Sequence, residues 1–275
     1  MSQDSRRPLD RLSRRLLTSI RWRLLQPKPP KVALHGMEVL SIGSKYGRKS
    51  FIRPNSITNT LIVISGGVGE DISFDIELAN LYKCKIILVD PSPAAIHHFQ
   101  AVVDSVGNKP QTNYSDTSRQ PVSSYDLSNI STDDLSFRPV GLWSSTEKLD
   151  FYQPPDASRD ASGSISAIHS YYKPTASPFE INVTTIQDLM SDFKLDHIDI
   201  LKLDIEGAAL EVIQRMFSDR IYPDQILVEV DEMHFPSFKS KFRARQLFRL
   251  LKKHGYSLLC IDSCDFLYVR TGLLS

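Results

Sequence analysis

Three glycines and two acidic residues crowd into six positions shortly after the apolar segment 61–64. These six positions are Gly66, Gly67, Val68, Gly69, Glu70 and Asp71. An apolar strand, a glycine turn and a helix, in that order, bring the backbone of an α/β protein close to a nucleotide-like ligand. The two carboxylates argue against a phosphate at the start of this helix. They favour a ligand that carries an amino group or a sulfonium cation.

A further acid lies at the spacing expected of a ribose-binding residue. The apolar run 85–89 is followed by Asp90, which comes 21 residues after Gly69. This is close to the roughly 20 residues typical of dinucleotide-binding folds. A carboxylate there can accept charge-assisted hydrogen bonds from both hydroxyls of a ribose. The alternative is an acid at a solvated strand end.

Two later apolar runs also end in acids. The first ends in Asp204 and Glu206 before a glycine, and the second ends in Glu229 and Asp231. The carboxyl ends of parallel strands face the ligand crevice of an open α/β sheet. Acids at the ends of three separate strands therefore indicate a site.

A sheet with helices between its strands must position these acids. Apolar runs alternate with amphipathic segments, which predicts an α/β fold. We expect helices at 71–82, 91–106 (with Ser92 as N-cap), 184–193, 208–217 and 239–254. We expect strands at 61–64, 85–90, 135–143, 149–152, 197–204, 226–231, 256–261 and 266–270, after a hairpin within 31–60. The polar stretch 108–133 is either a lid or a decorating loop, and together with 154–180 it is expected to shape the acceptor side of the site.

The first 30 residues differ from the rest of the chain. Eight basic and two acidic residues give this segment a net charge of +6, whereas the whole chain carries +1. Apolar residues recur at helical spacing from Leu9 to Leu24, and prolines follow. We therefore expect a basic amphipathic arm and proline-rich linker at 1–30, before one domain at 31–275. Such a helix can pack on the domain, lie on an anionic membrane surface or bind an acidic partner.

The composition, 41% apolar and 24% charged, is that of a soluble globular protein. No apolar run approaches the roughly 20 residues of a membrane span. Three cysteines suit a reducing compartment, so we expect a cytoplasmic protein, with peripheral membrane contact through the arm as an option. The near-neutral charge and the lack of interleaved basic and aromatic patches in 31–275 argue against a nucleic-acid partner.

Five blocks in this order resemble the FkbM-type methyltransferases. The blocks are 65–75, 89–93, 141–143, 198–207 and 227–229, and the resemblance covers residues 60–270. It implies a class I, Rossmann-like methyltransferase fold with a seven-stranded, mostly parallel sheet and helices on both faces. It also implies methyl transfer from S-adenosylmethionine, typically to a hydroxyl of a sugar, glycan or secondary metabolite. Gly67 stands where the family often has an aromatic or small residue, which only makes the turn more permissive.

The resemblance also assigns roles to residues. It places S-adenosylmethionine on Gly66, Gly67, Val68, Gly69, Glu70, Asp71, Asp90 and Pro91. Asp204 is the first candidate for the catalytic carboxylate, as the base or as the group that positions the acceptor, and Glu206 and Glu229 come next.

Other roles stay open for these carboxylates. Asp204 could instead cap the next helix, and Glu206 could bind backbone amides. A divalent metal could bridge Asp204, Glu229 and Asp231, although the spacing does not require one. His169 and His234 are further candidate bases.

Two other functions compete with methyl transfer. A dinucleotide-dependent oxidoreductase would need the pattern G-x-G-x-x-G, whereas this chain has G-G-x-G followed by two acids. A catalytically silent methyltransferase fold could act as a binding or membrane-associated scaffold, but such a protein would not need Asp90 and Asp204. No motif specifies the hydroxyl-bearing acceptor or the oligomeric state.

Overall fold

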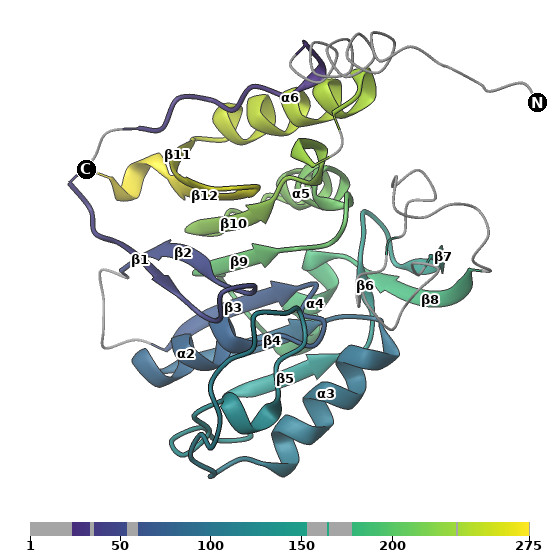
Figure 1. Cartoon of the computed structure of the whole chain (residues 1–275). Helices are drawn as coiled ribbons and strands as arrows, with labels where there is room; N and C mark the ends of the chain where they lie inside the picture. Colours follow the sequence, from purple (N-terminus) through teal and green to yellow (C-terminus); the bar gives the residue numbers. More distant parts are fainter. Residues whose placement is uncertain are drawn as a thin grey trace, which may run out of the picture.

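The computed structural model describes residues 24–33, 36–53, 60–152, 164, 178–234 and 236–274. The predicted arm helix therefore lies outside the described residues except for its end. The described residues are built around a seven-stranded sheet with the order β11-β12-β10-β9-β3-β4-β5 (Figure 1). Its strands are β3 (Leu61–Gly66), β4 (Cys84–Val89), β5 (Leu135–Arg138), β9 (Ile200–Leu203), β10 (Gln225–Glu229), β11 (Tyr256–Asp262) and β12 (Asp265–Arg270). Neighbouring strands from β10 to β5 are parallel, whereas β12 is antiparallel to both of its neighbours.

Helices cover both faces of this sheet (Figure 1). Helices α4 (Ile186–Phe193), α5 (Ala209–Ser218) and α6 (Phe238–Lys253) lie on one face, and α2 (Ser73–Leu81) and α3 (Pro93–Asp104) lie on the other. Successive strand residues alternate between the two faces. In β4, for example, Ile87 and Val89 pack with the first group of helices, and Ile86 and Leu88 pack with the second. Parallel strands buried on both faces must be apolar along their whole length, which explains the continuous apolar runs in the sequence.

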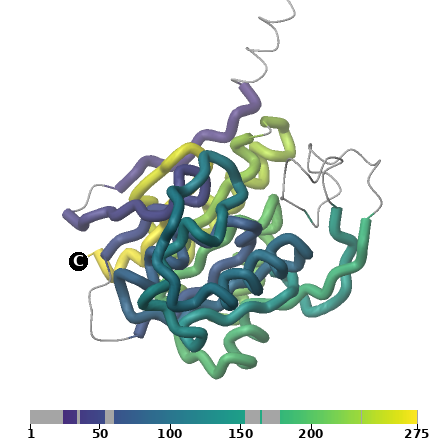
Figure 2. The backbone as a smooth tube through the Cα atoms, turned by 60° about the horizontal axis from the view of Figure 1, so that its bottom comes forward, coloured from purple at the N-terminus to yellow at the C-terminus, as the bar shows by residue number. Residues whose placement is uncertain are grey.

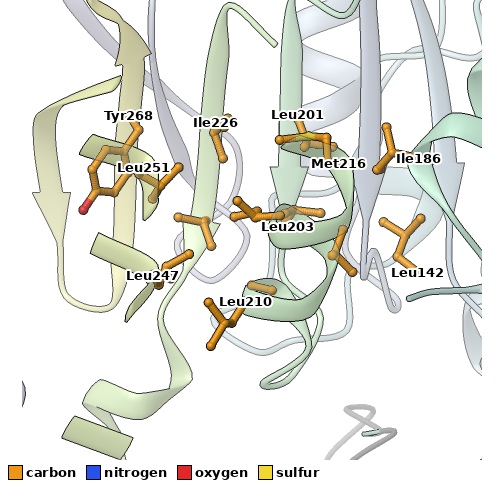
Figure 3. Packing of buried hydrophobic residues seen from close by; sticks show 14 of the residues in the cluster. Leu142, Ile186, Leu201, Leu203, Leu210, Met216, Ile226, Leu247, Leu251 and Tyr268 are labelled. Atoms are coloured by element: carbon orange, nitrogen blue, oxygen red, sulfur yellow. The ribbon is translucent and has the colours of Figure 1, made fainter. Parts of the chain in front are cut away.

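Figure 3 shows how strands and helices interlock on the first face. Leu201, Leu203 and Ile226 from the sheet meet Leu210 and Met216 of α5, with Leu247 and Leu251 of α6 and Ile186 of α4 beside them. Burying side chains of this size contributes about 1.5–3 kcal/mol each. This packing keeps the carboxyl ends of the central strands in fixed positions.

Polar side chains set the starts of three helices, of which the sequence analysis predicted one. Ser92 accepts a hydrogen bond from the amide of Ala95 at 3.3 Å, which confirms it as the N-cap of α3. Thr185 and Ser237 cap α4 and α6 in the same way. Each cap satisfies an amide that has no partner within its helix.

A hairpin of β1 (Val39–Ile42) and β2 (Lys49–Ile52) packs on the second face, near β10 and β12. The buried side-chain amide of Gln225 in β10 accepts a hydrogen bond from the backbone amide of Ile52 at 2.8 Å and donates one to the backbone carbonyl of Ile52 at 3.0 Å. Phe51 is fully buried against Phe74 of α2. The predicted hairpin is therefore confirmed, and its turn lies at the carboxyl ends of the strands.

The single strand predicted at 135–143 is wrong. Residues 135–138 form β5 of the main sheet, and β6 (Gly141–Leu142) belongs to a second sheet with the order β6-β8-β7. Pro139 separates them, because proline lacks the amide needed to continue the ladder. This small sheet, with β7 (Glu147–Phe151) and β8 (Phe179–Thr184), stands off to one side of the molecule (Figure 2).

The remaining segments are short. The described residues include the 3₁₀ helices η1 (Val122–Ser124), η2 (Asp231–Met233) and η3 (Thr271–Leu273). The polar stretch 108–133 folds back against the glycine turn, where the amide of Gln120 donates to the carbonyl of Glu70 at 3.0 Å. Of the predicted loop 154–180, only Ser164 and residues 178–180 are among the described residues. None of the described helices is long and apolar enough to span a bilayer.

Candidate active site

A cavity of about 880 Å³, counted with its open mouth, lies at the carboxyl ends of β3, β4 and β9. Three segments outside the main sheet complete its wall: the β1–β2 turn, the loop at Ser118 and the small sheet. Its lining comprises Tyr46, Gly47, Lys49, Gly67, Val68, Gly69, Glu70, Asp71, Val89, Asp90, Pro91, Ser92, Ser118, Gly141, Leu142, Phe151, Lys202, Asp204, Ile205 and Glu206.

The glycine turn forms the floor of this cavity. The amide of Gly67 donates to the carbonyl of Val89 at 2.9 Å, and the amide of Asp204 donates to the carbonyl of Gly66 at 3.0 Å. Gly67 has a φ of +73°, and a Cβ there would lie 1.6 Å from the carbonyl oxygen of Asp204. The expectation that glycine merely makes this turn more permissive is therefore wrong, because only glycine fits at position 67. Gly69 has a φ of +51°, and a Cβ added there would have no atom within 4 Å.

Asp90 holds the turn through its carboxylate. One oxygen accepts from the amides of Val68 at 3.0 Å and Gly69 at 2.9 Å, and the other accepts from the amide of Ser92 at 2.8 Å. A carboxylate has about four acceptor positions, of which three are used here. The remaining position is open to one further hydrogen-bond donor.

Glu70 and Asp71 line the cavity but are engaged within the protein. Glu70 forms an ion pair with Arg119 at 2.7 Å, which fastens the 108–133 segment over the turn. Asp71 accepts from the Ser44 hydroxyl at 2.6 Å and from the Ser73 amide at 3.0 Å. A Cβ at Gly47 would lie 2.7 Å from the Asp71 carboxylate. Asp71 thus joins the β1–β2 turn to the start of α2.

Lys49 of β2 reaches the predicted catalytic carboxylate. Its ammonium lies 2.9 Å from Asp204 and 2.5 Å from Asp265 of β12, and its side chain is buried. Burial opposes the charge of Lys49, but Asp204, Asp265 and Glu229 outweigh this effect and raise its pKa well above the usual value. Burial also opposes the ionisation of Asp204, but Lys49, a hydrogen bond from Glu229 and Lys202 hold its pKa well below the usual range.

Glu229 lies beside Asp204 without lining the cavity. The charge of Asp204, burial and a hydrogen bond to Asp204 raise the pKa of Glu229 well above its ordinary value. The raised pKa favours the protonated form of Glu229, which can donate a hydrogen bond to Asp204. His234 approaches Glu229 at 3.3 Å, so this predicted candidate base lies near the site but not in its lining.

Asp231 supports the turn that follows β9. Its carboxylate accepts from the amide of Gly207 at 2.6 Å, and burial together with the charges of Asp204 and Glu232 raises its pKa. Among the described residues, no group of three histidine, cysteine or acidic side chains has the geometry to hold a metal ion.

Glu206 lines the cavity from a strained backbone position. Its φ is +47°, which costs a non-glycine residue about 1–2 kcal/mol. The hydroxyl of Ser164 donates to its carbonyl at 2.8 Å. Helix α5 begins after Ala208 without a side-chain cap, so Asp204 is not the cap of this helix. Such strain is commonly found at functional sites.

The lining is acidic overall. It contains five carboxylates and two ammonium groups, those of Lys49 and Lys202. Lys202 is buried in β9 and donates to the Gly67 carbonyl at 3.4 Å. Behind the turn lies the fully buried Asp75 of α2, whose pKa is raised by burial against the opposing charge of Lys202. A cavity of this charge favours a cationic ligand over a phosphate.

The sequence patterns missed the residues that enter from other elements. Lys49, Tyr46 and Phe151 line the cavity, but nothing in their local sequence relates them to the glycine turn. Lys202 carried a usable signal, because a lysine inside the apolar run Ile-Leu-Lys-Leu must find a buried partner. The cavity brings together Asp204, Glu206 and all the predicted cofactor residues except Gly66, which lies just below it. His169 lies outside the described residues.

Comparison with known proteins agrees with this geometry. Residues 64–258 match the family described as the methyltransferase FkbM domain. The matched segment includes the glycine turn, Asp90, Asp204 and Glu229, but not Lys49. No curated protein and no solved structure matches the chain. Because the match covers most of its length, the chain belongs to the FkbM methyltransferase family.

Proposed function

We propose that this methyltransferase uses S-adenosylmethionine to methylate a hydroxyl group on a sugar, glycan or secondary metabolite. The observation that carries the proposal is the acidic cavity at the glycine turn, where Asp90 and Asp204 lie on opposite sides of Gly67. The strand order supports a class I assignment, since one antiparallel strand, β12, is inserted between β10 and β11.

The residues of the cavity fit this cofactor. S-adenosylmethionine supplies a methyl group on a sulfonium cation, together with an amino group and a ribose diol. The open space beside Gly69 allows close approach to the backbone, and the free acceptor position of Asp90 can take one ribose hydroxyl. The excess of carboxylates in the lining favours the positive charges of the donor.

Asp204 is better suited to position the acceptor than to remove its proton. A general base works best when its pKa is near the working pH. The pKa of Asp204 lies well below that, because Lys49, a hydrogen bond from Glu229 and Lys202 together outweigh the opposing effect of burial. As a fixed anion it accepts a hydrogen bond from the hydroxyl and aligns that oxygen for displacement. As the donor's carbon–sulfur bond breaks and the new carbon–oxygen bond forms, the hydroxyl would lose its proton, and we assign Glu206 of the same lining as the group that accepts it.

Two measurements test the proposal. Calorimetric titration should show binding of S-adenosylhomocysteine and no binding of NAD. A screen of sugars, glycans and hydroxylated metabolites with isotopically labelled donor should give a methylated product by mass spectrometry. Asp204→Asn should lower kcat strongly while leaving S-adenosylhomocysteine binding nearly unchanged. If the protein bound NAD but not S-adenosylhomocysteine, it would be an oxidoreductase. If it bound S-adenosylhomocysteine but Asp204→Asn left its cellular role unchanged, it would be a catalytically silent scaffold.

A further inference from the structure

Two aromatic side chains stand exposed on the outer side of α6. Phe238 is 82% exposed and Phe242 is 62% exposed. Residues four apart on a helix lie on the same side, so the two rings form one apolar patch. Isolated exposed apolar residues are ordinary, but an adjacent aromatic pair at the start of a helix is a distinct surface feature.

The same side of α6 continues as a row of cations. Arg245, Arg249 and Lys252 follow Phe238 at spacings of 7, 11 and 14 residues, and all three are exposed. Helix α6 contains seven basic residues and no acidic one. Within the described part of the chain, no ion pair is formed by Arg245, Arg249 or Lys252. The row is therefore available to an anionic partner.

Arg243 shows the contrast between the two sides of this helix. It faces inward, where it binds Glu211 at 2.5 and 2.8 Å and Glu232 at 2.9 Å, and it donates to the carbonyl of Gly207 at 2.7 Å. The inward cation is neutralised by the fold, whereas the outward cations are left unneutralised. Structural need thus explains Arg243 but not the outer row.

A third exposed apolar residue, Leu24, is held at Lys241, which directly precedes Phe242. The ammonium of Lys241 donates to the carbonyl of Leu24 at 2.6 Å, and Leu24 is 66% exposed. In the sequence, Leu24 directly follows residues 1–23, which carry seven arginines against two aspartates.

We propose that Phe238, Phe242 and Leu24, with the cation row Arg245, Arg249 and Lys252, form a docking face for an anionic membrane surface. Aromatic and aliphatic groups that enter the lipid headgroup region, flanked by lysine and arginine, are the features of interfacial membrane binding. The charge argues against the other occupants. A second copy of α6 would set the cation row against itself, and residues 1–23 are also basic.

This placement has a consequence for the cavity. Helix α6 begins just after β10 and η2, so its aromatic end lies at the same edge of the sheet as the cavity (Figure 1). Docking through Phe238 and Phe242 would turn that edge towards the membrane. The docking itself is independent of methyl transfer and can be tested without a substrate.

Vesicle co-sedimentation of the full chain tests the docking face. Vesicles of phosphatidylcholine are compared with vesicles of equal parts phosphatidylcholine and phosphatidylglycerol. We expect binding only to the anionic vesicles, weakened by salt. The double variant Phe238→Ser with Phe242→Ser should weaken vesicle binding at least about tenfold. The double variant Arg245→Gln with Arg249→Gln should weaken it by about fivefold for each charge removed. Ile96→Ser, which removes an exposed apolar residue of α3, should bind as the unchanged protein does.

Further outcomes would overturn the proposal. One is that both α6 double variants bind anionic vesicles as well as the unchanged protein does, and that binding is lost only when residues 1–23 are deleted. A second is equal binding to neutral and anionic vesicles. A third is binding to a single-stranded RNA that the α6 variants abolish, without any binding to vesicles. Because the substituted residues are exposed, thermal unfolding of each variant should match the unchanged protein, so lost binding reports on the surface and not on folding.

Discussion

Asp90 is the residue whose carboxylate meets both the glycine turn and the proposed ribose. We expect Asp90→Asn to weaken S-adenosylhomocysteine binding at least about tenfold, because a side-chain amide would put its own donors near the amides of Val68 and Gly69. Isothermal titration calorimetry measures the effect. Asp104→Asn, an exposed acid on α3, is the matched control and should bind normally. Unchanged binding by Asp90→Asn would refute the ribose assignment.

Gly67 is fixed by a backbone contact rather than by the ligand. We expect Gly67→Ala to lower the free energy of unfolding by at least about 3 kcal/mol, because the new methyl would overlap the Asp204 carbonyl. Gly107→Ala is the control, since it has a similar left-handed φ of +92° but open space around it. It should cost about 1–2 kcal/mol. Urea unfolding compares the two, and equal losses would show that the contact does not matter.

At the scale of elements, the β1–β2 hairpin delivers Lys49 into the site. We expect Lys49→Met to lower the free energy of unfolding by about 3 kcal/mol, because it leaves the partly buried carboxylates of Asp204 and Asp265 without their cation. Lys45→Met, which removes an exposed pair with Asp116, should cost no more than about 1 kcal/mol. Chemical denaturation measures both. If Lys49→Met is as mild as the control, the hairpin is not held by this ion pair.

Helix α6 is joined to α5 and η2 through Arg243. We expect Arg243→Gln to cost roughly 1.5–3 kcal/mol, because charged hydrogen bonds to Glu211 and Glu232 are lost in a partly buried position. Arg245→Gln, one step along the helix but exposed, should change the unfolding free energy by less than about 0.5 kcal/mol. Thermal and urea unfolding of the two variants measure these costs, and a similar loss of unfolding free energy in both would contradict the role given to Arg243.

At the scale of the whole molecule, the cluster of buried acids links stability to pH. The raised pKa of Glu229 means that the folded protein keeps a proton that the unfolded chain releases near pH 4.5. Stability from this group therefore falls as the pH rises above about 4.5 towards the raised pKa. Asp204 acts in the opposite sense, since its lowered pKa gives stability that is lost as the pH falls below about 3.8.

Glu229→Gln tests this linkage, because glutamine keeps the hydrogen bond to Asp204 without titrating. We expect its unfolding free energy to fall less steeply with rising pH than that of the unchanged protein. Some slope should persist, because burial also raises the pKa of Asp231 and Asp265. Glu180→Gln, an exposed acid paired with Lys148, should keep the full slope. Identical slopes for both variants would mean that Glu229 is ionised in the folded protein.

The amino-acid sequence by itself determined what depends on local pattern. The continuous apolar runs, the Ser92 cap and the glycine turn each follow from neighbouring residues, and each is found as predicted. The spacing of Asp90 from the turn could also be read, because a single strand–helix–strand unit separates them. The catalytic and cofactor roles of the predicted residues stay predictions.

Only the tertiary structure decided the contacts between distant segments. Lys49 meets Asp204 and Asp265, which are 155 and 216 residues away, because β2 lies against the sheet where β9 ends and β12 begins. The break at Pro139 and the strand β8 depend on which sheet each segment joins. The folded surroundings also shift the two carboxyl groups in opposite directions: the pKa of Asp204 is lowered beside Lys49, and the pKa of Glu229 is raised beside Asp204. No local pattern carries this information, because desolvation and ion pairing depend on the surroundings in the folded chain.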